Sequence, residues 1–316
     1  MHDIQKYRQA IKAKAIELGF DAVAITSPDI PENQISIFSE WIATGKHAGM
    51  DYMEKHADLR KHPEILFPGT KSVIMLLKSY HRSNLPDMPW KVSRYALGKD
   101  YHKRLKKRMK KLQAAIRDIT GEDFKSRPFV DSAPVMERSL ALKSGLGWIG
   151  KNTCLINRDL GSYVFIAELF TDLELTTDKA ETKNFCGNCR LCIEACPTQA
   201  LTDRGMDAGR CISYHTIESK TDIPEWMHDK LNGWVFGCDI CQEVCPWNKK
   251  PLNTDDPDFQ PGNHLDKISI RNLSQMSDVE FSTLFAGTPF RRTGREKLLR
   301  NLLSAERGNR MHNTDI

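Results

Sequence analysis

The chain has 316 residues, of which 40% are hydrophobic and 28% are charged. This composition is typical of a soluble globular protein with room for more than one domain. No apolar run approaches the ~18 residues of a membrane-spanning helix, and no leader pattern precedes the first helical pattern. We therefore expect a cytoplasmic protein without a membrane partner. The net charge of +5 is too mild to indicate a nucleic-acid partner by itself.

Helical and strand patterns alternate through the first 175 residues. Apolar residues recur at helical spacing over 4–19, 35–43, 100–120 and, beginning at Pro134, 134–144. Strand patterns cover 22–25, 71–80, 124–130, 153–156 and 163–170. Interleaved patterns of this kind predict one sheet with helices layered on it.

Two stretches of the chain are strongly basic. One is the helix pattern that begins near Lys99 and continues to Lys111, and the other runs from Arg291 to Arg300. A solvated helix face is the ordinary explanation for either stretch alone. Two such stretches in one chain favour a phosphate-rich partner.

The second half of the chain carries two cysteine runs that both end in Cys-Pro. The first has the spacing C-x2-C-x2-C-x3-C-P and comprises Cys186, Cys189, Cys192 and Cys196. In bacterial ferredoxins with two [4Fe–4S] clusters, three close thiolates of such a run hold one cluster and the fourth ligates the other. The first run therefore predicts a ferredoxin-like module that moves single electrons.

The second run lacks its first cysteine and comprises Cys238, Cys241 and Cys245. Cys211 lies between the runs and can supply the missing thiolate. We therefore expect one cluster on the first cysteine set and a second cluster on the second set. The first set is Cys186, Cys189, Cys192 and Cys245, and the second set is Cys196, Cys211, Cys238 and Cys241.

Other cysteine and glycine chemistry fits the sequence less well. Disulfides are disfavoured because the cysteines are clustered and no secretion signal is present. Two C-x2-C pairs can build a zinc site, but the x2-x2-x3 rhythm with Cys-Pro endings favours iron–sulfur clusters. The glycines of 145–150 follow a helix and lead into a strand, which is the reverse of a dinucleotide fingerprint.

Several motifs together resemble the epoxyqueuosine reductase family. They are F-V-D-S-A-P-V-M-E-R at 129–138, G-L-G-W-I-G-K-N at 145–152, G-S-Y at 161–163, C-I-S-Y-H-T-I-E at 211–218 and F-G-C-D-I-C-Q-E-V-C-P-W-N at 236–248. The resemblance covers the chain from about residue 50 to the tail, and a series of motifs in this order is highly specific. The family's longer members carry a C-terminal helical-repeat extension, which we do not expect in this chain.

The resemblance implies an α+β fold in three parts. A mixed α/β cobalamin-binding catalytic domain is expected over 1–175, a ferredoxin-like domain with two [4Fe–4S] clusters over 176–250, and a short helical C-terminal segment over 251–316. The implied cofactors are a base-off cob(II)alamin and the two clusters. The implied reaction is reduction of the epoxide of epoxyqueuosine, at the wobble position of the tRNA anticodon loop, to queuosine. An external low-potential electron donor and a monomeric state are further expectations.

Asp131 is the candidate catalytic residue. It follows an apolar strand and precedes a helix, a position that also suits a plain helix cap. The family resemblance implies that Asp131 is the proton donor and lies against the cofactor. We expect burial between a corrin face and a base to raise its pKa, so that the carboxyl stays protonated near neutral pH.

The individual cofactor contacts are expected from the loops around these motifs. Candidates, beside Asp131 itself, are Arg60, Tyr95, Lys151, Asn152, Cys154, Ser162, Ser213, Thr216 and Asp239. Cys154 is the ninth cysteine and belongs to neither set of four. A buried packing role is an alternative for it. His102 follows Asp100 as in the D-x-H-x-x-G signature of cobalt-ligating histidines, but Leu105 replaces the glycine, so we interpret His102 as a surface or partner-binding residue.

Two alternative functions remain open at this point. A reductive dehalogenase-like enzyme would use the same cofactors on a small molecule, but such enzymes typically carry a twin-arginine export signal. A pure electron carrier would need little beyond its clusters, whereas about 175 residues precede the cysteine module here.

Overall fold

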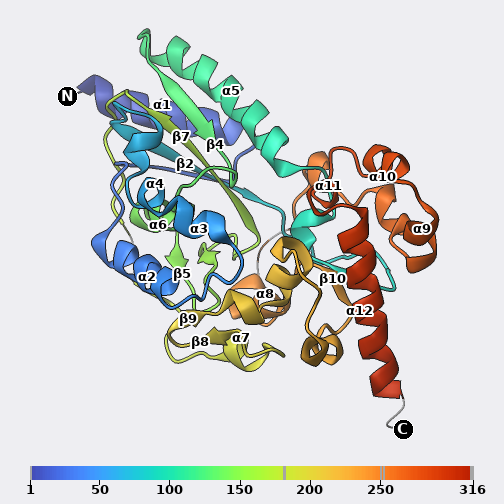
Figure 1. The fold of residues 1–316 in the computed structure, drawn as a ribbon. Helices are drawn as coiled ribbons and strands as arrows, with labels where there is room; N and C mark the ends of the chain where they lie inside the picture. The colour runs from blue at the N-terminus through green and yellow to red at the C-terminus, as the bar shows by residue number, and fades with distance from the viewer. Residues whose placement is uncertain (1, 181–182, 250, 252, 314–316) are drawn as a thin grey trace.

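The computed structural model describes residues 2–180, 183–249, 251 and 253–313. Its N-terminal part is built on a four-stranded sheet in the order β1-β2-β7-β4 (Figure 1). The strands are β1 (Ala22–Thr26), β2 (Ser72–Ser79), β7 (Val164–Thr171) and β4 (Ser126–Phe129). Every neighbouring pair is antiparallel. No helix among the described residues is long and apolar enough to cross a membrane.

Helices cover both faces of this sheet, which explains why its central strands are apolar throughout. On β2, Ile74 and Leu76 pack toward α1 (His2–Glu17) and α5 (Tyr101–Thr120). Val73 and Met75 point to the opposite face, toward α6 (Glu137–Lys143) and the loops around it. A strand that is buried on both faces reads as a continuous hydrophobic run.

Helix α5 has clear start and stop signals. The Asp100 carboxylate accepts the backbone N–H of His102, and Gly121 ends the helix in the left-handed conformation with φ of +68°. One stripe of the helix is buried and comprises Tyr101, Leu105, Met109, Leu112, Ile116 and Thr120. The basic residues of the expected 100–120 helix occupy the rest of its surface.

Smaller elements complete the N-terminal part. They are α2 (Glu32–Ala43), α3 (Asp51–Lys55), α4 (Ala57–Lys61), η1 (Pro63–Leu66), β3 (Lys91–Val92), η2 (Arg94–Ala96), β5 (Trp148–Ile149) and β6 (Leu155–Ile156). Several expected bounds differ by two or three residues: the helix expected from 35 begins at Glu32, and the strand expected from 124 begins at Ser126. The expected strand from 153 begins only at Leu155, because Thr153 adopts a left-handed φ of +64°. The expected helix from Pro134 begins at Glu137, because residues 131–136 form a turn first.

The cysteine module consists of short helices and two-stranded ladders. Its elements are α7 (Leu191–Glu194), β8 (Leu201–Thr202), β9 (Gly205–Met206), η3 (Ala208–Arg210), η4 (Tyr214–Glu218), η5 (Glu225–Lys230), β10 (Trp234–Phe236), α8 (Ile240–Glu243) and η6 (Pro246–Asn248). Helices α7 and α8 pack together, and each carries the middle of one cysteine run. Strand β10 pairs in parallel with β3 of the N-terminal part.

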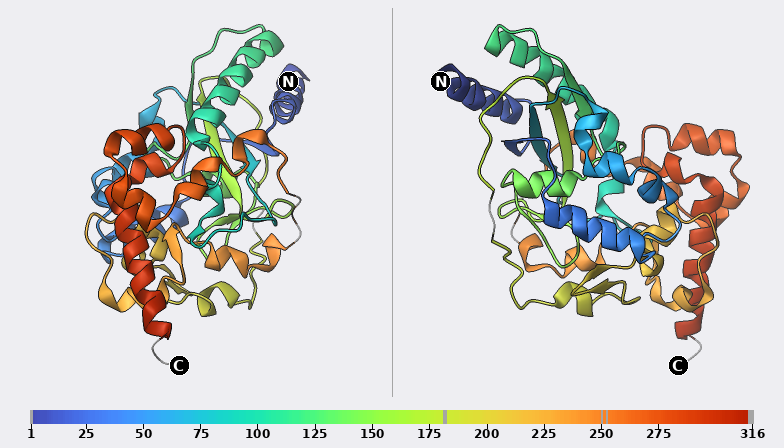
Figure 2. Two further views of the ribbon diagram at one scale, coloured as in Figure 1. Left: turned by 90° about the vertical axis from the view of Figure 1, so that its right-hand side faces the viewer. Right: turned by 60° about the vertical axis from the view of Figure 1, so that its left-hand side comes forward.

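The C-terminal segment forms several helices rather than one. They are η7 (Pro257–Phe259), η8 (Asn263–Lys267), α9 (Ile270–Gln275), α10 (Asp278–Leu284), α11 (Phe290–Thr293) and α12 (Arg295–Asn313). Figure 2 shows α12 lying along the side of the cysteine module. The fully buried Asn301 joins them, because its Nδ2 donates to the Thr216 and Val235 carbonyls at 2.8 and 2.9 Å.

One hydrophobic core crosses two of the expected domain boundaries. It contains Val92 and Ala96 from the first expected domain, Trp234 from the second, and Leu298 and Leu302 from the third. The linker residues 181–182 and the boundary residue 250 lie outside the described residues. The three-part division therefore remains a prediction, and the last two parts share a core.

Candidate functional site

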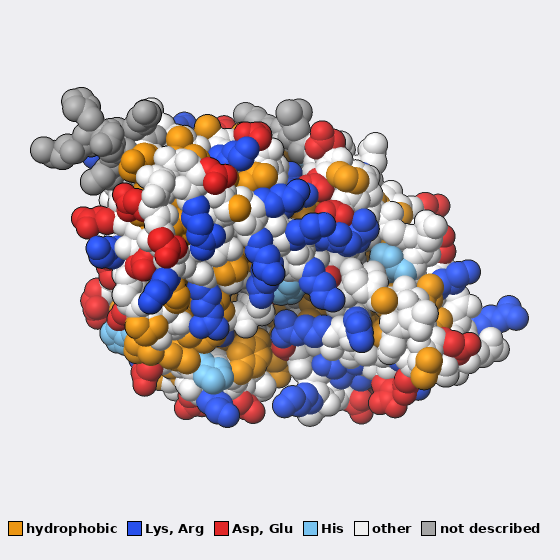
Figure 3. Space-filling view, turned by 90° about the horizontal axis from the view of Figure 1, so that it is seen from above, with side chains coloured by type: hydrophobic (Ala, Val, Ile, Leu, Met, Phe, Trp, Pro, Cys, Tyr) orange, Lys and Arg blue, Asp and Glu red, His pale blue; other side chains and the backbone are white. Residues whose placement is uncertain are grey.

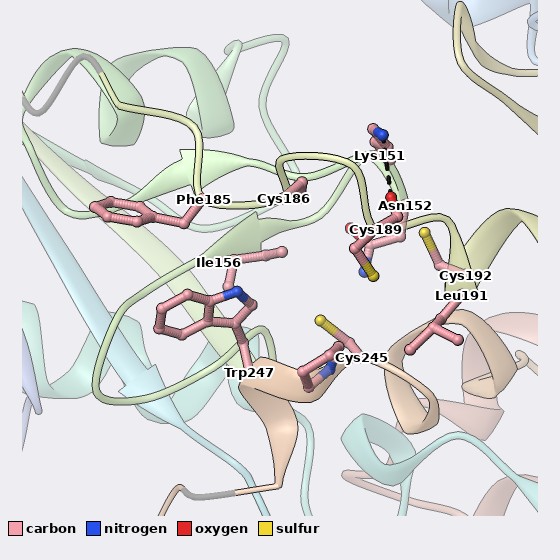
Figure 4. A pocket seen from close by; sticks show the side chains of 11 residues that line it. Lys151, Asn152, Ile156, Phe185, Cys186, Cys189, Leu191, Cys192, Cys245 and Trp247 are labelled. Carbon is pink, nitrogen blue, oxygen red and sulfur yellow. Dashed lines mark hydrogen bonds between the residues drawn. The ribbon is translucent and has the colours of Figure 1, made fainter.

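The first cysteine set surrounds a cavity of about 300 Å³. Cys186, Cys189, Cys192 and Cys245 all line it, although Cys245 comes from the second run. In Figure 4 the sulfur atoms of Cys189 and Cys245 point into the same space. The Cys192 pKa is raised by burial and then by its neighbour Cys186, and the Cys245 pKa is raised by burial and by Cys186 and Cys189.

The walls of this cavity come from the loop that begins at Gly150 and from an aromatic cluster. Lys151 Nζ donates to the carbonyls of Gly187 and Cys189 at 3.0 Å each, which ties this loop to the first run (Figure 4). The Asn152 Nδ2 group is buried, lines the same cavity and has no hydrogen-bond partner among the described residues. It is a donor available to a sulfide acceptor inside the cavity.

The second cysteine set has no exposed member, since all four of its cysteines are half-buried. Burial raises the pKa of Cys211, Cys238 and Cys241, and their next contributions come in part from one another. Cys196 also contributes to the pKa values of Cys211 and Cys238. Cys196 Sγ accepts the backbone N–H of Ala200 at 3.3 Å, as thiolate ligands commonly do. The structure thus places the four cysteines of the first set around one cavity and those of the second set within electrostatic reach of one another.

All nine cysteines are free of disulfides. Across the described residues, no three Cys, His, Asp or Glu side chains are grouped so closely that they could hold a single metal ion. The first set instead encloses a cavity with its thiols around the rim. This arrangement suits a multi-atom cluster better than one zinc ion, which needs four ligand atoms within about 2.3 Å.

Cys154 lies between the two sets. Its pKa is raised to about 11 by burial, with further contributions from Asp239, Cys245 of the first set and Cys211 of the second. A thiol with so high a pKa stays protonated near neutral pH. Burial raises the pKa of Cys238 and Cys241 in the same way, so only the sequence spacing leaves Cys154 outside both sets.

Asp131 stands in a strained turn at the end of β4. Its φ is +53°, in the left-handed region that Asp tolerates better than most residues. Its backbone N–H donates to Glu137 Oε1 at 2.5 Å, and its Oδ2 accepts the Tyr101 hydroxyl at 2.5 Å. About half of the side chain, 49%, is exposed. The carboxyl is therefore hydrogen-bonded on one side and accessible to solvent on the other.

The pKa of Asp131 is lowered in this structure. Burial opposes ionisation, but hydrogen bonds from His102 and Tyr101 outweigh it and lower the Asp131 pKa below its ordinary value. The expected raised pKa concerns a carboxyl that is covered by the cofactor and a base, so it stays a prediction. Here Asp131 is an ionised acceptor of both hydrogen bonds.

His102 is partly buried and contacts Asp131, which its interpretation as a surface or partner-binding residue did not include. His102 Nδ1 lies 2.8 Å from Asp100 Oδ1, and Nε2 lies 3.3 Å from Asp131 Oδ2. Burial would lower the His102 pKa, but these two carboxylates raise it to about 9. The helix-capping position of Asp100 was visible in the sequence, whereas the approach of Asp131 depends on the tertiary fold.

A buried carboxyl pair behind Asp131 was missed as well. Glu168 on β7 is fully buried, and neither of its oxygens has an N–H or hydroxyl donor among the described residues. Burial raises the Glu168 pKa to about 8 and raises the Glu137 pKa well above its ordinary value. The two carboxyls hydrogen-bond to each other, which requires a proton on one of them. The signal was a lone Glu in the apolar pattern of 163–170.

Arg60 and Tyr95, two of the predicted cofactor contacts, lie near Asp131. Burial lowers the Arg60 pKa, and Asp131 is among the charges that interact with this guanidinium. Arg60 Nε is buried and has no partner among the described residues, so it is available to a ligand's amide oxygen. Burial and then Asp131 raise the Tyr95 pKa, and the Tyr95 ring packs edge-on against Tyr101.

Four other candidates lie where the N-terminal part meets the cysteine module. Ser162 Oγ donates to Gln242 at 2.9 Å and accepts Asn248 Nδ2 at 2.8 Å. Thr216 is fully buried and donates to the Ile212 carbonyl, next to Ser213. Asp239 accepts the Arg94 backbone N–H at 2.8 Å, and burial raises its pKa to about 6. Their hydrogen bonds join structural elements together.

The basic stretch on α5 divides into two groups. Lys99, Arg104 and Arg108 pair with the carboxylates of Asp256 and Asp258 and so hold the segment 256–259 against the helix. The exposed group is the basic stripe, which comprises Lys103, Lys107, Lys110 and Lys111. Figure 3 shows Lys and Arg side chains gathered across the middle of this face.

Helix α5, which carries the basic stripe, runs past Asp131: Lys106 Nζ donates to Ser132 Oγ at 3.3 Å, and Tyr101 donates to Asp131 itself. The C-terminal basic stretch is mostly engaged within the protein. Lys297 Nζ donates to the Ile217 carbonyl, and Arg300 donates to the His215 carbonyl. Arg292 is 60% exposed, pairs with Glu218 and interacts with Asp131 through its charge.

Comparison with known protein families gave two matches. A model described as "Epoxyqueuosine reductase QueG" matches residues 60–132, and a "4Fe-4S double cluster binding domain" matches residues 185–248. The first match ends just after Asp131, and the second contains all eight cysteines of the two sets.

Similar proteins cover nearly the whole chain. A protein named epoxyqueuosine reductase from Leadbetterella byssophila is 43% identical over 302 residues, which are 95% of this chain and 98% of the relative. Those from Pseudomonas aeruginosa and Escherichia coli are 44% and 39% identical and are covered to 85% and 81% of their lengths.

A crystal structure of epoxyqueuosine reductase with an epoxyqueuosine-modified tRNA-Tyr stem loop superimposes with a TM-score of 0.85. It is 26% identical to this chain, and the match covers 96% of this chain and 81% of that one.

Proposed function

The chain belongs to the epoxyqueuosine reductase family, and we propose that Asp131, the two cysteine sets and the basic stripe perform the family's reaction in it. The protein reduces the epoxide of epoxyqueuosine in tRNA to queuosine, with cobalamin and two [4Fe–4S] clusters. The observation that carries this assignment is 43% identity over 95% of the chain. It also decides against a dehalogenase-like enzyme, because these relatives are named for the tRNA reaction.

We propose the two cysteine sets as the ligands of the two clusters. The cavity inside Cys186, Cys189, Cys192 and Cys245, and the buried donor of Asn152 in its wall, support the first cluster. The electrostatic contacts among Cys196, Cys211, Cys238 and Cys241 support the second. The exposure of Cys189 supports entry of electrons from an external low-potential donor at the first cluster.

Cobalamin fits best in front of Asp131, on the side away from Glu137. The half-exposed Asp131 carboxyl and the unpartnered Arg60 Nε border this region, and Tyr95 closes it toward the cysteine module. When bound, the cofactors supply the two electrons of the reduction. Ser162, Ser213, Thr216, Asp239 and Cys154 would then lie behind the cofactor, at the junction with the second cysteine set.

The residues of this chain supply the proton and the binding surface. Reduction of the epoxide to an alkene breaks two carbon–oxygen bonds and releases water, so a general acid must lie beside the nucleoside. Asp131 is the proposed donor to the departing oxygen. Lys103, Lys107, Lys110 and Lys111 are the proposed contacts to the backbone of the anticodon stem loop, since single-stranded loops are bound by basic contacts together with base stacking.

A tRNA substrate also supports a cytoplasmic location and action as a monomer on one stem loop. The direct test of the function is reduction of epoxyqueuosine-containing tRNA by anaerobically purified protein loaded with cobalamin and clusters. Nucleoside analysis should show queuosine appearing as epoxyqueuosine disappears. A loaded protein that leaves the modified nucleoside unchanged contradicts the proposed function.

A further inference from the structure

We propose that His102 stores the proton that Asp131 passes to the departing epoxide oxygen, and that Asp100 holds His102 in this role. The inference rests on the proposed function, because it concerns the proton of that reaction. It adds two residues, His102 and Asp100, that act through Asp131 and do not touch the substrate.

The geometry places one ring between two carboxylates. Asp100 Oδ1 lies 2.8 Å from Nδ1, and Asp131 Oδ2 lies 3.3 Å from Nε2. The imidazole stacks on Tyr101 with ring centroids 4.1 Å apart, and Tyr101 in turn stacks on Phe165 at 4.1 Å. The ring is therefore fixed in the one orientation that directs both nitrogens at oxygen acceptors.

The charges around the site place the proton on the ring. Both ring nitrogens can donate only when the imidazole is charged. Asp100 and Asp131 raise the His102 pKa to about 9, while the Asp131 pKa lies below its ordinary value. At neutral pH, His102 is therefore protonated and the neighbouring Asp131 is ionised. The other charged or titratable groups that interact with these residues include Tyr52, Arg60, Tyr95, Tyr101, Lys103, Glu137, Glu168 and Arg292.

Neighbouring acids are less suited to the role. Burial and Asp131 raise the Tyr101 pKa, so its hydroxyl retains its proton and positions Asp131 instead. Glu137 and Glu168 share a proton, but Glu137 reaches Asp131 through the backbone N–H. His102 donates to the carboxyl oxygen itself, and 25% of its side chain is exposed for reprotonation from water.

The electrons and protons of the proposed reaction balance. The overall reduction consumes two electrons and two protons, converts the epoxide to a carbon–carbon double bond and releases one water. The electrons come from an external low-potential donor through the iron–sulfur clusters. The proposed relay breaks the Nε2–H bond of His102 and forms an O–H bond on Asp131 Oδ2. Asp131 then gives this proton to the departing oxygen, and neutral His102 takes another from solvent. A second passage of the relay supplies the second proton of the released water.

The pH dependence of turnover by the fully loaded enzyme tests the proposal. The wild type should lose kcat as pH rises past about 9, because His102 is then neutral. The variant His102→Gln should lower kcat about 10- to 100-fold, with tRNA affinity and iron content unchanged, and should lack this alkaline loss. Asp100→Asn keeps the helix cap but removes one carboxylate, so the alkaline loss should move down by about 1 pH unit or more.

Three outcomes overturn the proposal while the proposed function stands. The first is an active wild type without alkaline loss of kcat. The second is a His102→Gln variant with full kcat. The third is a slowed His102→Gln variant that still shows the same alkaline loss, which would assign the titration to another group. If the wild type itself does not reduce epoxyqueuosine in tRNA, the proposed function is contradicted instead.

Discussion

The backbone N–H of Asp131 donates to Glu137 Oε1 at 2.5 Å, six residues further along the chain. This bond closes the turn in which Asp131 has a φ of +53°. The carboxyl pair Glu137–Glu168 thus positions the backbone of the proposed catalytic residue, while Tyr101 and His102 position its side chain.

Asp131→Asn should abolish most turnover without disturbing the fold. Asn tolerates the left-handed conformation as Asp does, so the turn should be retained. The amide does not donate an acidic proton, and the loss of a general acid typically costs 10²–10⁴-fold in rate. Single-turnover conversion of epoxyqueuosine tRNA measures the effect. Iron content and the visible spectrum should match the wild type, and activity within about threefold of wild type would contradict the assignment.

Cys245→Ser should remove one cluster. Although Cys245 belongs to the second run, it lines the cavity of the first set, so its loss should lower iron from about eight to about four atoms per chain. Cys154→Ser is the matched control, since this thiol lies between the sets and should leave the iron content unchanged. Iron analysis of the anaerobically purified variants measures this difference. An equal loss in both variants would contradict the ligand sets.

Charge reversal of Lys103, Lys107 and Lys110 should weaken tRNA binding at least tenfold. Each phosphate contact to a single strand contributes about 0.7 to the slope of log affinity against log salt, so the slope should fall by about 2. Binding of the stem loop at several salt concentrations measures both changes.

The control for this variant reverses three exposed lysines off the stripe, Lys179, Lys220 and Lys267. It should bind with nearly wild-type affinity and an unchanged slope. Equal effects in the two triple variants would assign the binding to net charge and not to the basic stripe.

Glu168→Gln should make the protein more stable at alkaline pH. The Glu168 pKa is about 8 in the folded protein and near 4.3 in an unfolded chain. The folded state therefore holds a proton that the unfolded state has lost, and wild-type stability falls as pH rises between these values. The slope reaches at most about 1.4 kcal/mol per pH unit.

The difference between variant and wild type should grow from pH 5 to pH 8 and then level off. Thermal unfolding followed by circular dichroism measures it across that range. Glu174→Gln, at an exposed position beyond the end of the same strand, should change little at any pH. A difference that is constant with pH would exclude a shared proton at Glu168.

The sequence predicted those features of the site that depend on local spacing. The two cysteine sets follow from C-x2-C spacing and the Cys-Pro endings, and the central strands follow from their apolar runs. The environment of Asp131 did not follow, because Tyr101 and His102 are about 30 residues away in the chain. Glu168 reaches the site through its register opposite Phe129, which no local pattern reveals.

Local spacing also failed to predict the contacts of the C-terminal basic stretch. Its spacing predicted a surface for a phosphate-rich partner, yet Lys297 and Arg300 donate to carbonyls of the segment 215–221. A basic side chain satisfies a backbone carbonyl as readily as a phosphate, and only the packing of α12 against the cysteine module distinguishes the two.

The unequal exposure of the two cysteine sets has a consequence for handling the protein in air. Cys189 is exposed at the rim of the first set, whereas Cys211, Cys238 and Cys241 of the second are less accessible. Oxygen should therefore destroy the clusters in order, beginning with the one at Cys189, and electron paramagnetic resonance of reduced samples should show one signal fading before the other. A partly oxidised preparation would still bind its tRNA, but it would have lost the cluster through which electrons are proposed to enter.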